Sequence, residues 1–145
     1  MAPLSRGNVS ISSADTAVQP LINPNWLTHP TDQQVAVAAY KRARQAFATP
    51  VMREVIIGPE AYPGVDVQSD EEILATIKLS FNTVYHASGT NRMGKKGDPL
   101  AVVDSRARVF GVKRLRVVDA SAFPFLPPGH PMSTVCEFLF FFGCL

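Results

Sequence analysis

Polar and apolar positions alternate in one short stretch near the start of the chain. Residues 8–12 read Asn-Val-Ser-Ile-Ser, and this period of two predicts a half-buried β-strand, with a turn at residues 13–15. Residues 20–30 read as a loop that carries the single tryptophan, Trp26. We expect Trp26 to be a packing anchor, and the alternative is a side chain that lines a substrate entrance.

A helical period of apolar positions follows over residues 31–49. Thr31 and Gln34 form a capping box, in which the threonine hydroxyl faces a backbone N–H and the glutamine side chain reaches back. Pro50 is expected to end the helix, because proline cannot donate to the helical ladder. The apolar positions on one face of this helix are Ala36, Tyr40, Ala43 and Phe47.

A second helix is predicted over residues 69–82. Ser69 and Glu72 repeat the capping box, and the acidic residues 70–72 lie at the positive end of the helix dipole. We interpret this acidic cluster as a helix cap and not as a pair of catalytic carboxylates. The apolar positions on one face are Ile73, Ile77 and Phe81.

The second half of the chain is rich in strand-forming and turn-forming residues. Short β-rich pieces lie at residues 101–103, 108–110 and 115–118. Four prolines and Gly129 restrict the backbone over residues 124–131, and Pro131 suits the first position of a last helix, where its missing N–H would have no partner. Together with the two earlier helices, these segments predict an α+β fold with an antiparallel sheet.

Composition indicates one globular domain. The 145 residues are 46% hydrophobic and 18% charged, which is enough apolar material to bury a core. A formal charge of +2 is too small to indicate a nucleic-acid partner. Cys136 and Cys144 show neither metal-ligand spacing nor a disulfide framework, so we predict no metal site.

The two ends of the chain bear on the compartment. Residues 1–6 lack the basic stretch and apolar core of a signal peptide. The apolar tail at residues 138–145 is far shorter than the roughly 20 residues that span a bilayer. We therefore predict no transmembrane segment, and we leave the localisation open.

Two histidines stand out as candidate catalytic residues. His86 opens a glycine-containing stretch at residues 86–94, and His130 lies near the end of the proline-rich stretch at residues 124–131. Imidazole exchanges a proton most readily near neutral pH, so two rings on backbone that is fixed by glycine and proline suit proton transfer.

Five motifs follow one another around these histidines. They are His-Ala-Ser-Gly-Thr-Asn-Arg-Met-Gly at 86–94, Val-Val-Asp at 102–104, Arg-Val-Phe-Gly-Val at 108–112, Leu-Arg-Val-Val-Asp-Ala-Ser at 115–121 and Gly-His-Pro at 129–131. In order and spacing they resemble the C-terminal region of the glucose-methanol-choline (GMC) family of flavin-dependent oxidoreductases, in the form common in filamentous fungi. Residues 3–7 and 24–27 also look like the substrate-domain entrance of that family, so the resemblance covers nearly the whole chain.

The resemblance implies a division of the chain into three parts. Residues 1–84 would be a portion of the substrate domain, an antiparallel sheet with flanking helices. Residues 85–135 would be the flavin-facing strand, loop and helix with both histidines, and residues 136–145 an atypical hydrophobic tail. The family begins with a Gly-x-Gly-x-x-Gly loop that cradles the pyrophosphate of FAD, and this sequence contains no such loop. We therefore expect an incomplete FAD-binding domain, whose N-terminal part belongs to a full-length parent.

The resemblance also implies a reaction, the FAD-dependent oxidation of a CH–OH group in a small alcohol. His86 is the candidate general base, and His130 is the second imidazole, which orients the substrate oxygen. We expect the two rings to approach each other across an open cavity. Residues implied to lie against the flavin or its ribityl chain are Asp119, Ala120, His130, Pro131 and Met132. For Asp119, the alternative is a cap on the following turn.

Other interpretations stay open. The chain is either part of an alcohol-oxidising enzyme, a non-catalytic fragment without FAD, or a relative that uses flavin for a cyclase or lyase reaction. It departs from the family at Asn91, where Cys is common, and after Val135, where the family continues as Ala-Glu-Lys-Ile and this chain becomes rich in Phe. Eight Lys and Arg residues at 86–119 form either a solvated face or a rim that attracts FAD phosphate or an anionic substrate.

Overall fold

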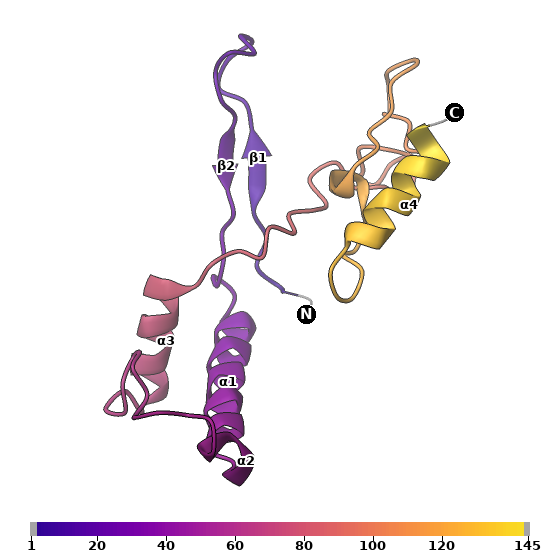
Figure 1. The fold of residues 1–145 in the computed structure, drawn as a ribbon. Coiled ribbons are helices and arrows are strands. Elements are labelled where there is room, and N and C mark those ends of the chain that lie inside the picture. Colours follow the sequence, from indigo (N-terminus) through magenta and orange to yellow (C-terminus); the bar gives the residue numbers. More distant parts are fainter. Residues whose placement is uncertain (1–2, 144–145) are drawn as a thin grey trace. The chain divides into compact units, whose positions relative to one another are not determined.

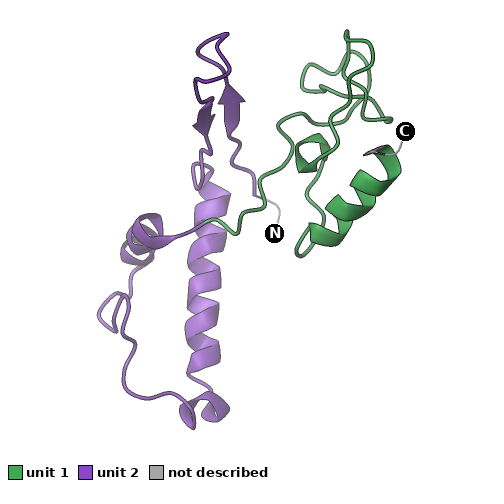
Figure 2. Cartoon of the chain, turned by 45° about the horizontal axis from the view of Figure 1, so that its top comes forward, with its two compact units in different colours: residues 1–2, 83–145 green, residues 3–82 purple. Residues whose placement is uncertain are grey.

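The computed structural model describes residues 3–143, and seven short elements lie in that range. Figure 1 shows their arrangement along the chain. In chain order they are β1 (Asn8–Ser10), β2 (Leu21–Asn23), α1 (Pro30–Phe47), α2 (Pro50–Arg53), α3 (Asp70–Ser80), the 3₁₀ helix η1 (Ala120–Ala122) and α4 (Met132–Gly143). Within the described residues, a two-stranded antiparallel sheet and α-helices confirm the predicted α+β class. The chain divides into two compact units, residues 3–82 and residues 83–143 (Figure 2).

The first unit begins with a β-ribbon. β1 and β2 pair antiparallel with Val9 opposite Ile22, and the connection turns where the Val18 N–H donates to the Asp15 carbonyl (3.1 Å). The predicted strand is confirmed, but its predicted half-burial is wrong, because a two-stranded ribbon leaves both of its faces open. Val9 is 48% exposed and Ile22 is 67% exposed. β2 lies inside the segment predicted as a loop, where its pairing with β1 supplies the order that its short sequence does not signal.

α1 begins one residue before its predicted start. His29 is the N-cap, and its Nδ1 accepts a hydrogen bond from the Thr31 N–H (3.2 Å). The predicted Thr31 cap is wrong because Pro30, with its fixed φ and no N–H to lose, fits the first helical position and makes Thr31 the second helical residue. At the other end, Pro50 does not simply end the helix: it opens the separate single turn α2.

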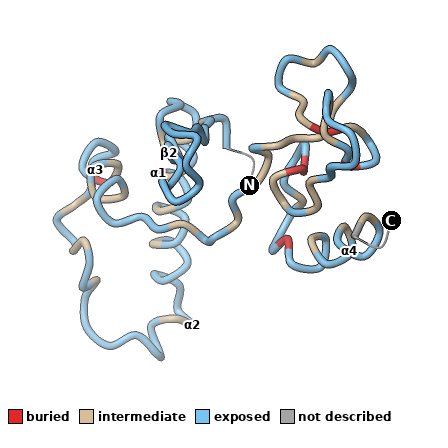
Figure 3. Tube along the Cα trace, turned by 90° about the horizontal axis from the view of Figure 1, so that it is seen from above, coloured by how far each residue is buried: buried red, intermediate tan, exposed pale blue. Residues whose placement is uncertain are grey.

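The buried face of α1 also differs from the predicted one. Val37 is 6% exposed and faces α3, whereas Ala43 and Phe47 on the predicted face are exposed. The apolar period alone could not place α3, and the position of α3 decides which side of α1 is covered. Buried positions are few along the whole described chain (Figure 3).

Arg44 fastens the loop between α2 and α3 onto α1. Its guanidinium forms an ion pair with Glu60 (Nε–Oε2 2.9 Å) and donates to the carbonyl oxygens of Val67 (2.7 Å) and Gly64 (3.2 Å). Tyr40 donates its hydroxyl to the same Glu60 carboxylate (2.7 Å). Hydrogen bonds from Tyr40 and then Arg44 lower the pKa of Glu60. Charge-assisted hydrogen bonds therefore join this loop to α1.

α3 carries the capping box that the sequence predicts. The Glu72 N–H donates to Ser69 Oγ (3.2 Å), and the Ser69 N–H donates to Glu72 Oε2 (3.1 Å). Ile73 is the buried residue of this helix. Just beyond its end, Phe81 meets the ring of Trp26 edge to face, with centroids 5.4 Å apart. This contact supports the interpretation of Trp26 as a packing anchor.

In the second unit, the three predicted β-rich pieces form single bridges rather than strands. Val103 bridges Met93 and Val109, and Arg108 bridges Arg116. Left-handed residues between these pairs, such as Ala107 (φ 58°) and Arg114 (φ 61°), turn the chain before a ladder can extend. The buried residues of this unit include Val103, Ala107, Ala122 and Phe123.

The last helix, α4, starts at Met132, one residue after the predicted position. The carbonyl of Pro131 accepts the first helical hydrogen bond from the Val135 N–H (2.8 Å). Residues 136–143 of the tail are helical, and residues 144 and 145 lie outside the described range. Within the described chain, every helix is too short or too polar to cross a membrane.

The N-terminal segment is tied to α1 through one carboxylate. Asp32 accepts hydrogen bonds from the Leu4 N–H (2.9 Å), the Ser5 N–H (2.7 Å) and the Ser5 hydroxyl (2.5 Å). These bonds, that of Leu4 first, lower the pKa of Asp32 from 3.8 to about 2. The same Ser5 hydroxyl accepts from the N–H groups of Thr28 (3.1 Å) and His29 (3.0 Å), so Ser5 joins Asp32 to the start of the helix.

We expect Asp32→Ala to release residues 4 and 5 from α1, which raises their amide hydrogen-exchange rates and lowers the melting temperature. Since the folded-state pKa lies below the unfolded one, the contribution of Asp32 to stability is complete above its ordinary pKa of 3.8 and is lost as the pH falls through about 2. The amide chemical shifts of Leu4 and Ser5, followed by NMR, should titrate in that range. An unchanged titration in Asp32→Asn would contradict the assignment.

Candidate functional site

The segment that begins at His86 is hydrogen-bonded along the turn η1. Three of its backbone N–H groups donate to the three carbonyl oxygens of η1: Gly89 to Ala120 (3.2 Å), Asn91 to Ser121 (2.9 Å) and Met93 to Ala122 (2.8 Å). The donors are the alternate residues 89, 91 and 93, whereas the acceptors are three successive residues. The first histidine motif is therefore fixed to the Asp-Ala-Ser motif.

Gly89 shows why this segment needs a glycine. Its φ is 79°, in the left-handed region, and an added Cβ would lie 3.4 Å from the carbonyl oxygen of Phe123. A larger residue would strain the backbone at this point. The glycine of the motif is thus required by its left-handed backbone conformation, since the space beside it would admit a Cβ in ordinary contact.

Asp119 caps η1. Its Oδ1 accepts a hydrogen bond from the Ser121 N–H (2.7 Å). The capping role that the sequence analysis left as an alternative is confirmed, and contact between Asp119 and a flavin stays a prediction. Ala122 and Phe123, at the end of the turn, are buried with exposed fractions of 0% and 6%.

α4 is fastened to the same turn by aromatic packing. The ring of Phe138 meets Phe123 edge to face with centroids 5.4 Å apart, and Phe142 packs on Phe138 at 4.8 Å. Pro131, just before the helix, is buried. The loop that carries His130 therefore ends at a helix whose position is set by Phe123.

The structure brings His86 and His130 into direct contact. His86 Nε2 and His130 Nδ1 are 2.7 Å apart, and the rings stand at 88° with centroids 4.9 Å apart. The predicted approach of the two rings is confirmed. The open cavity expected between them is wrong, because a hydrogen bond joins them directly.

This contact constrains the protons on the two rings. A nitrogen-to-nitrogen hydrogen bond requires an N–H on one ring and a lone pair on the other, so at least one of the two facing nitrogens is unprotonated. His86 is half-buried and His130 is exposed, so the pair is accessible from solvent. The arrangement can accept a proton from a hydroxyl group placed beside either ring.

The other predicted cofactor residues lie on η1 and at the start of α4. Asp119 and Met132 are exposed, Ala120 is half-buried, and Pro131 is buried among residues of the chain itself. The first turn of the 12-residue helix α4 has backbone N–H groups without acceptors inside the helix, at the positive end of the helix dipole. These donors and the small side chain of Ala120 fit the flat, electron-rich edge of a flavin.

The basic residues of this unit are partly neutralised. Arg108 pairs with Asp104 (2.7 Å), and Arg92 pairs with Asp98 (2.6 Å). The Arg108 side chain is the main cause that holds the pKa of Asp104 at about 2. Exposure of the other cations, Lys95, Lys96, Arg106, Lys113, Arg114 and Arg116, supports the solvated-face interpretation. Among the residues described, no group of three His, Cys, Asp or Glu side chains could hold a metal ion.

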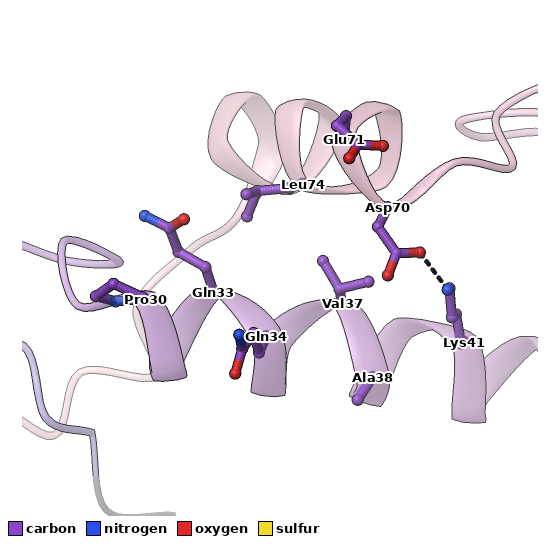
Figure 4. Close-up of a pocket in the computed structure, with 9 residues that line it drawn as sticks. All are labelled: Pro30, Gln33, Gln34, Val37, Ala38, Lys41, Asp70, Glu71 and Leu74. Carbon is purple, nitrogen blue, oxygen red and sulfur yellow. Dashed lines mark hydrogen bonds and ion pairs between the residues drawn. The ribbon is translucent and has the colours of Figure 1, made fainter.

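A separate hollow of about 330 Å³ lies between α1 and α3 in the first unit (Figure 4). Val37 and Leu74 face each other across it, and an ion pair between Lys41 and Asp70 lies at one end. None of the predicted site residues lines this hollow. Its side chains are those that pack the two helices together.

Sequence reasoning missed the residues that assemble the site. Asn91 was noted only as a departure from the family pattern, yet its side chain bonds to Ser121 (Nδ2···Oγ 3.0 Å). Phe138 lies in the tail that was set apart as atypical, yet it packs on Phe123. For Asn91, the signal in the sequence was the chemical match between its amide and the hydroxyl of Ser121, in a later motif of the chain.

Comparison with known proteins agrees with the family resemblance of the sequence motifs. A family model described as GMC oxidoreductase matches residues 3–137. The chain is similar to the patulin synthase of Aspergillus clavatus, with 62% identity over 133 residues, which cover 92% of this chain and 21% of that protein. The chain thus spans about a fifth of the length of the curated relatives it matches.

Solved structures agree with the sequence comparison. An FAD-dependent oxidoreductase from Chaetomium thermophilum superposes with a TM-score of 0.85 and 37% identity, covering 94% of this chain and 23% of that one. A fungal aryl-alcohol oxidase superposes with a TM-score of 0.77 and 29% identity, covering 94% and 22% of the two chains.

We expect the two histidines to show a nuclear spin coupling across their hydrogen bond when the ring nitrogens are isotope-labelled. The coupling should join Nε2 of His86 to Nδ1 of His130, because one of these two nitrogens carries the hydrogen and the other accepts it. His130→Ala should abolish it, while His29→Ala, at the other histidine of the chain, should leave it. Two rings without any such coupling at neutral pH would contradict the observed pair.

Proposed function

The chain belongs to the GMC oxidoreductase family, and we propose that it is the C-terminal part of an FAD-dependent enzyme that oxidises the CH–OH group of a small alcohol. Family membership gives an oxidoreductase, and the family and its FAD-dependent structural neighbours imply FAD. The similarity to an aryl-alcohol oxidase favours an alcohol as the substrate. The observation that carries the proposal is the 2.7 Å contact between His86 and His130.

The pair supplies a proton acceptor and a second polar group at one place. In the proposed reaction, an unprotonated nitrogen of His86 takes the hydroxyl proton of the alcohol, and His130 holds the oxygen in line. Bound FAD supplies the acceptor for the hydrogen that leaves the carbinol carbon. Because the proton is removed as the carbon–hydrogen bond breaks, no free alkoxide has to accumulate.

The flavin-facing surface in this proposal is formed by η1 and the start of α4. Asp119 and Ala120 would lie beside the ring or its ribityl chain, and Met132 would present its backbone N–H at the helix start. Pro131 is buried, so we assign it the role of starting the helix and orienting His130. These groups bind and orient, and the histidines move the proton.

A second candidate is a flavin-containing cyclase or lyase. One observation favours it: the 62% identical relative is named a synthase. The two candidates differ in whether substrate conversion reduces the flavin. Anaerobic mixing of enzyme and substrate separates them, because an alcohol oxidation bleaches the flavin in proportion to product, and a cyclisation without net redox change does not.

We expect His86→Ala to slow flavin reduction by roughly 10²–10⁴-fold, the usual contribution of a positioned general base. The measurement is anaerobic stopped-flow reduction in a chimera, in which this chain replaces the matching region of the Aspergillus clavatus patulin synthase. FAD content should be unchanged, because the proposed flavin contacts lie on η1 and α4. His130→Ala should also slow the step through lost orientation of the substrate oxygen.

The control for this prediction is His29→Ala, which removes the N-cap of α1 and none of the proposed site. It should lower the melting temperature without lowering the rate of flavin reduction per bound FAD. A His86→Ala chimera that reduces its flavin at the unmodified rate would eliminate the proposed base.

We also expect the chain expressed alone not to purify with one FAD per molecule. Its sequence lacks the Gly-x-Gly-x-x-Gly loop of the family, so the proposed contacts reach only the isoalloxazine and ribityl part. The absorbance spectrum of the purified chain gives the ratio of flavin to protein. A ratio near one would show that this segment is sufficient for binding.

A further inference from the structure

Asn91 is bonded to Ser121 twice. Its backbone N–H donates to the Ser121 carbonyl (2.9 Å), and its side-chain Nδ2 donates to the Ser121 hydroxyl (3.0 Å). Both residues are half-buried. The backbone bond can form with any residue except proline at position 91, but the side-chain bond depends on the amide.

Ser121 lies between Asn91 and the residue proposed to face the cofactor. Its N–H donates to Asp119 Oδ1 (2.7 Å) while its hydroxyl accepts from Asn91. Rotation or displacement of Ser121 would therefore move the cap of η1 and the carbonyl of Ala120, to which the Gly89 N–H donates. Ser121 is thus held at its hydroxyl by the side chain of Asn91 and at its N–H by Asp119.

The positions of both histidines depend on the turn at residues 119–123. His86 precedes Asn91 in the same hydrogen-bonded segment. His130 precedes α4, whose Phe138 packs on Phe123, two residues after Ser121. Two series of contacts, one from each histidine, thus meet at residues 119–123, and together they set the 2.7 Å separation of the rings.

We propose that Asn91, acting through Ser121, is a positioning residue that sets His86 relative to His130 and to the cofactor-facing turn. Asn91 does not act on substrate itself. The consequence for catalysis rests on the function proposed above, whereas the consequence for the geometry of the histidine pair does not.

The first test measures flavin reduction in the chimera with patulin synthase. Asn91→Ala and Ser121→Ala should each slow the step about tenfold, since small misplacement of a catalytic group costs rate without costing binding. The double variant should be no slower than either single variant, because both remove the same bond. Ser121→Thr keeps the hydroxyl and should reduce its flavin faster than Ser121→Ala does, whereas the control Asn82→Ala at an exposed asparagine should retain the unmodified rate.

Three results would overturn the inference. One is an Asn91→Ala chimera with the unmodified rate. Another is a pair of losses that add in the double variant. The third is a loss confined to FAD content, melting temperature or substrate affinity with the rate per bound FAD unchanged, which would mean that the bond is merely structural.

The second test needs no activity and uses the chain itself. Asn91→Ala and Ser121→Ala should each weaken the coupling between the ring nitrogens of His86 and His130, and Asn82→Ala and Ser121→Thr should preserve it. If the chimera fails to oxidise alcohols but the coupling weakens as expected, the proposed function is wrong and the positioning inference stands. A coupling that is unchanged in Asn91→Ala overturns the inference whatever the chimera does.

Discussion

The site depends on a single turn of five residues, Asp119 to Phe123. Three successive carbonyl oxygens of this turn accept N–H groups from the segment that begins at His86, and its last residue carries the aromatic contact that places α4 and His130. A 3₁₀ turn can do this because its carbonyls are not all consumed within so short a helix. Two segments that are far apart in the sequence therefore pack on the same turn. This shared contact brings their histidines within a hydrogen bond of 2.7 Å.

Sequence reasoning succeeded where the signal was local and failed where it was not. The Ser69 and Glu72 capping box was predictable because both partners lie within one turn of helix. The start of α1 was misassigned because Pro30 offered a competing local signal one residue earlier. The buried face of α1 and the partner of β1 depend on elements that come later in the chain, and no period in the sequence reports them. For the site, the motifs identified both histidines, but the contacts through Phe138 and Asn91 exist only in three dimensions.

Hydrogen bonds to charged side chains hold several segments of the first unit in place. Its buried apolar residues are Val37 and Ile73, while Arg44 joins one helix to a carboxylate and two carbonyls and Asp32 gathers three donors from the N-terminal segment. Such charge-assisted bonds are directional, so they specify geometry more strongly than a small apolar contact can. The second unit is different, since its buried residues include Val103, Ala107, Ala122 and Phe123, and the last two of these belong to the turn that holds the histidines.

The hydrogen bond between the two imidazoles also has a direction. It joins Nε2 of His86 to Nδ1 of His130, which leaves Nδ1 of His86 and Nε2 of His130 as the outer nitrogens of the pair. Suppose that both rings are neutral, and that one outer nitrogen gains a proton while the other outer nitrogen loses one. Each ring then changes its tautomer, and the donor and the acceptor of the hydrogen bond between the rings exchange roles. A pair that passes a proton along itself in this way ends in a different state from the one in which it started. It must then return, by ring rotation or by proton exchange with solvent, before it can pass a second proton in the same direction.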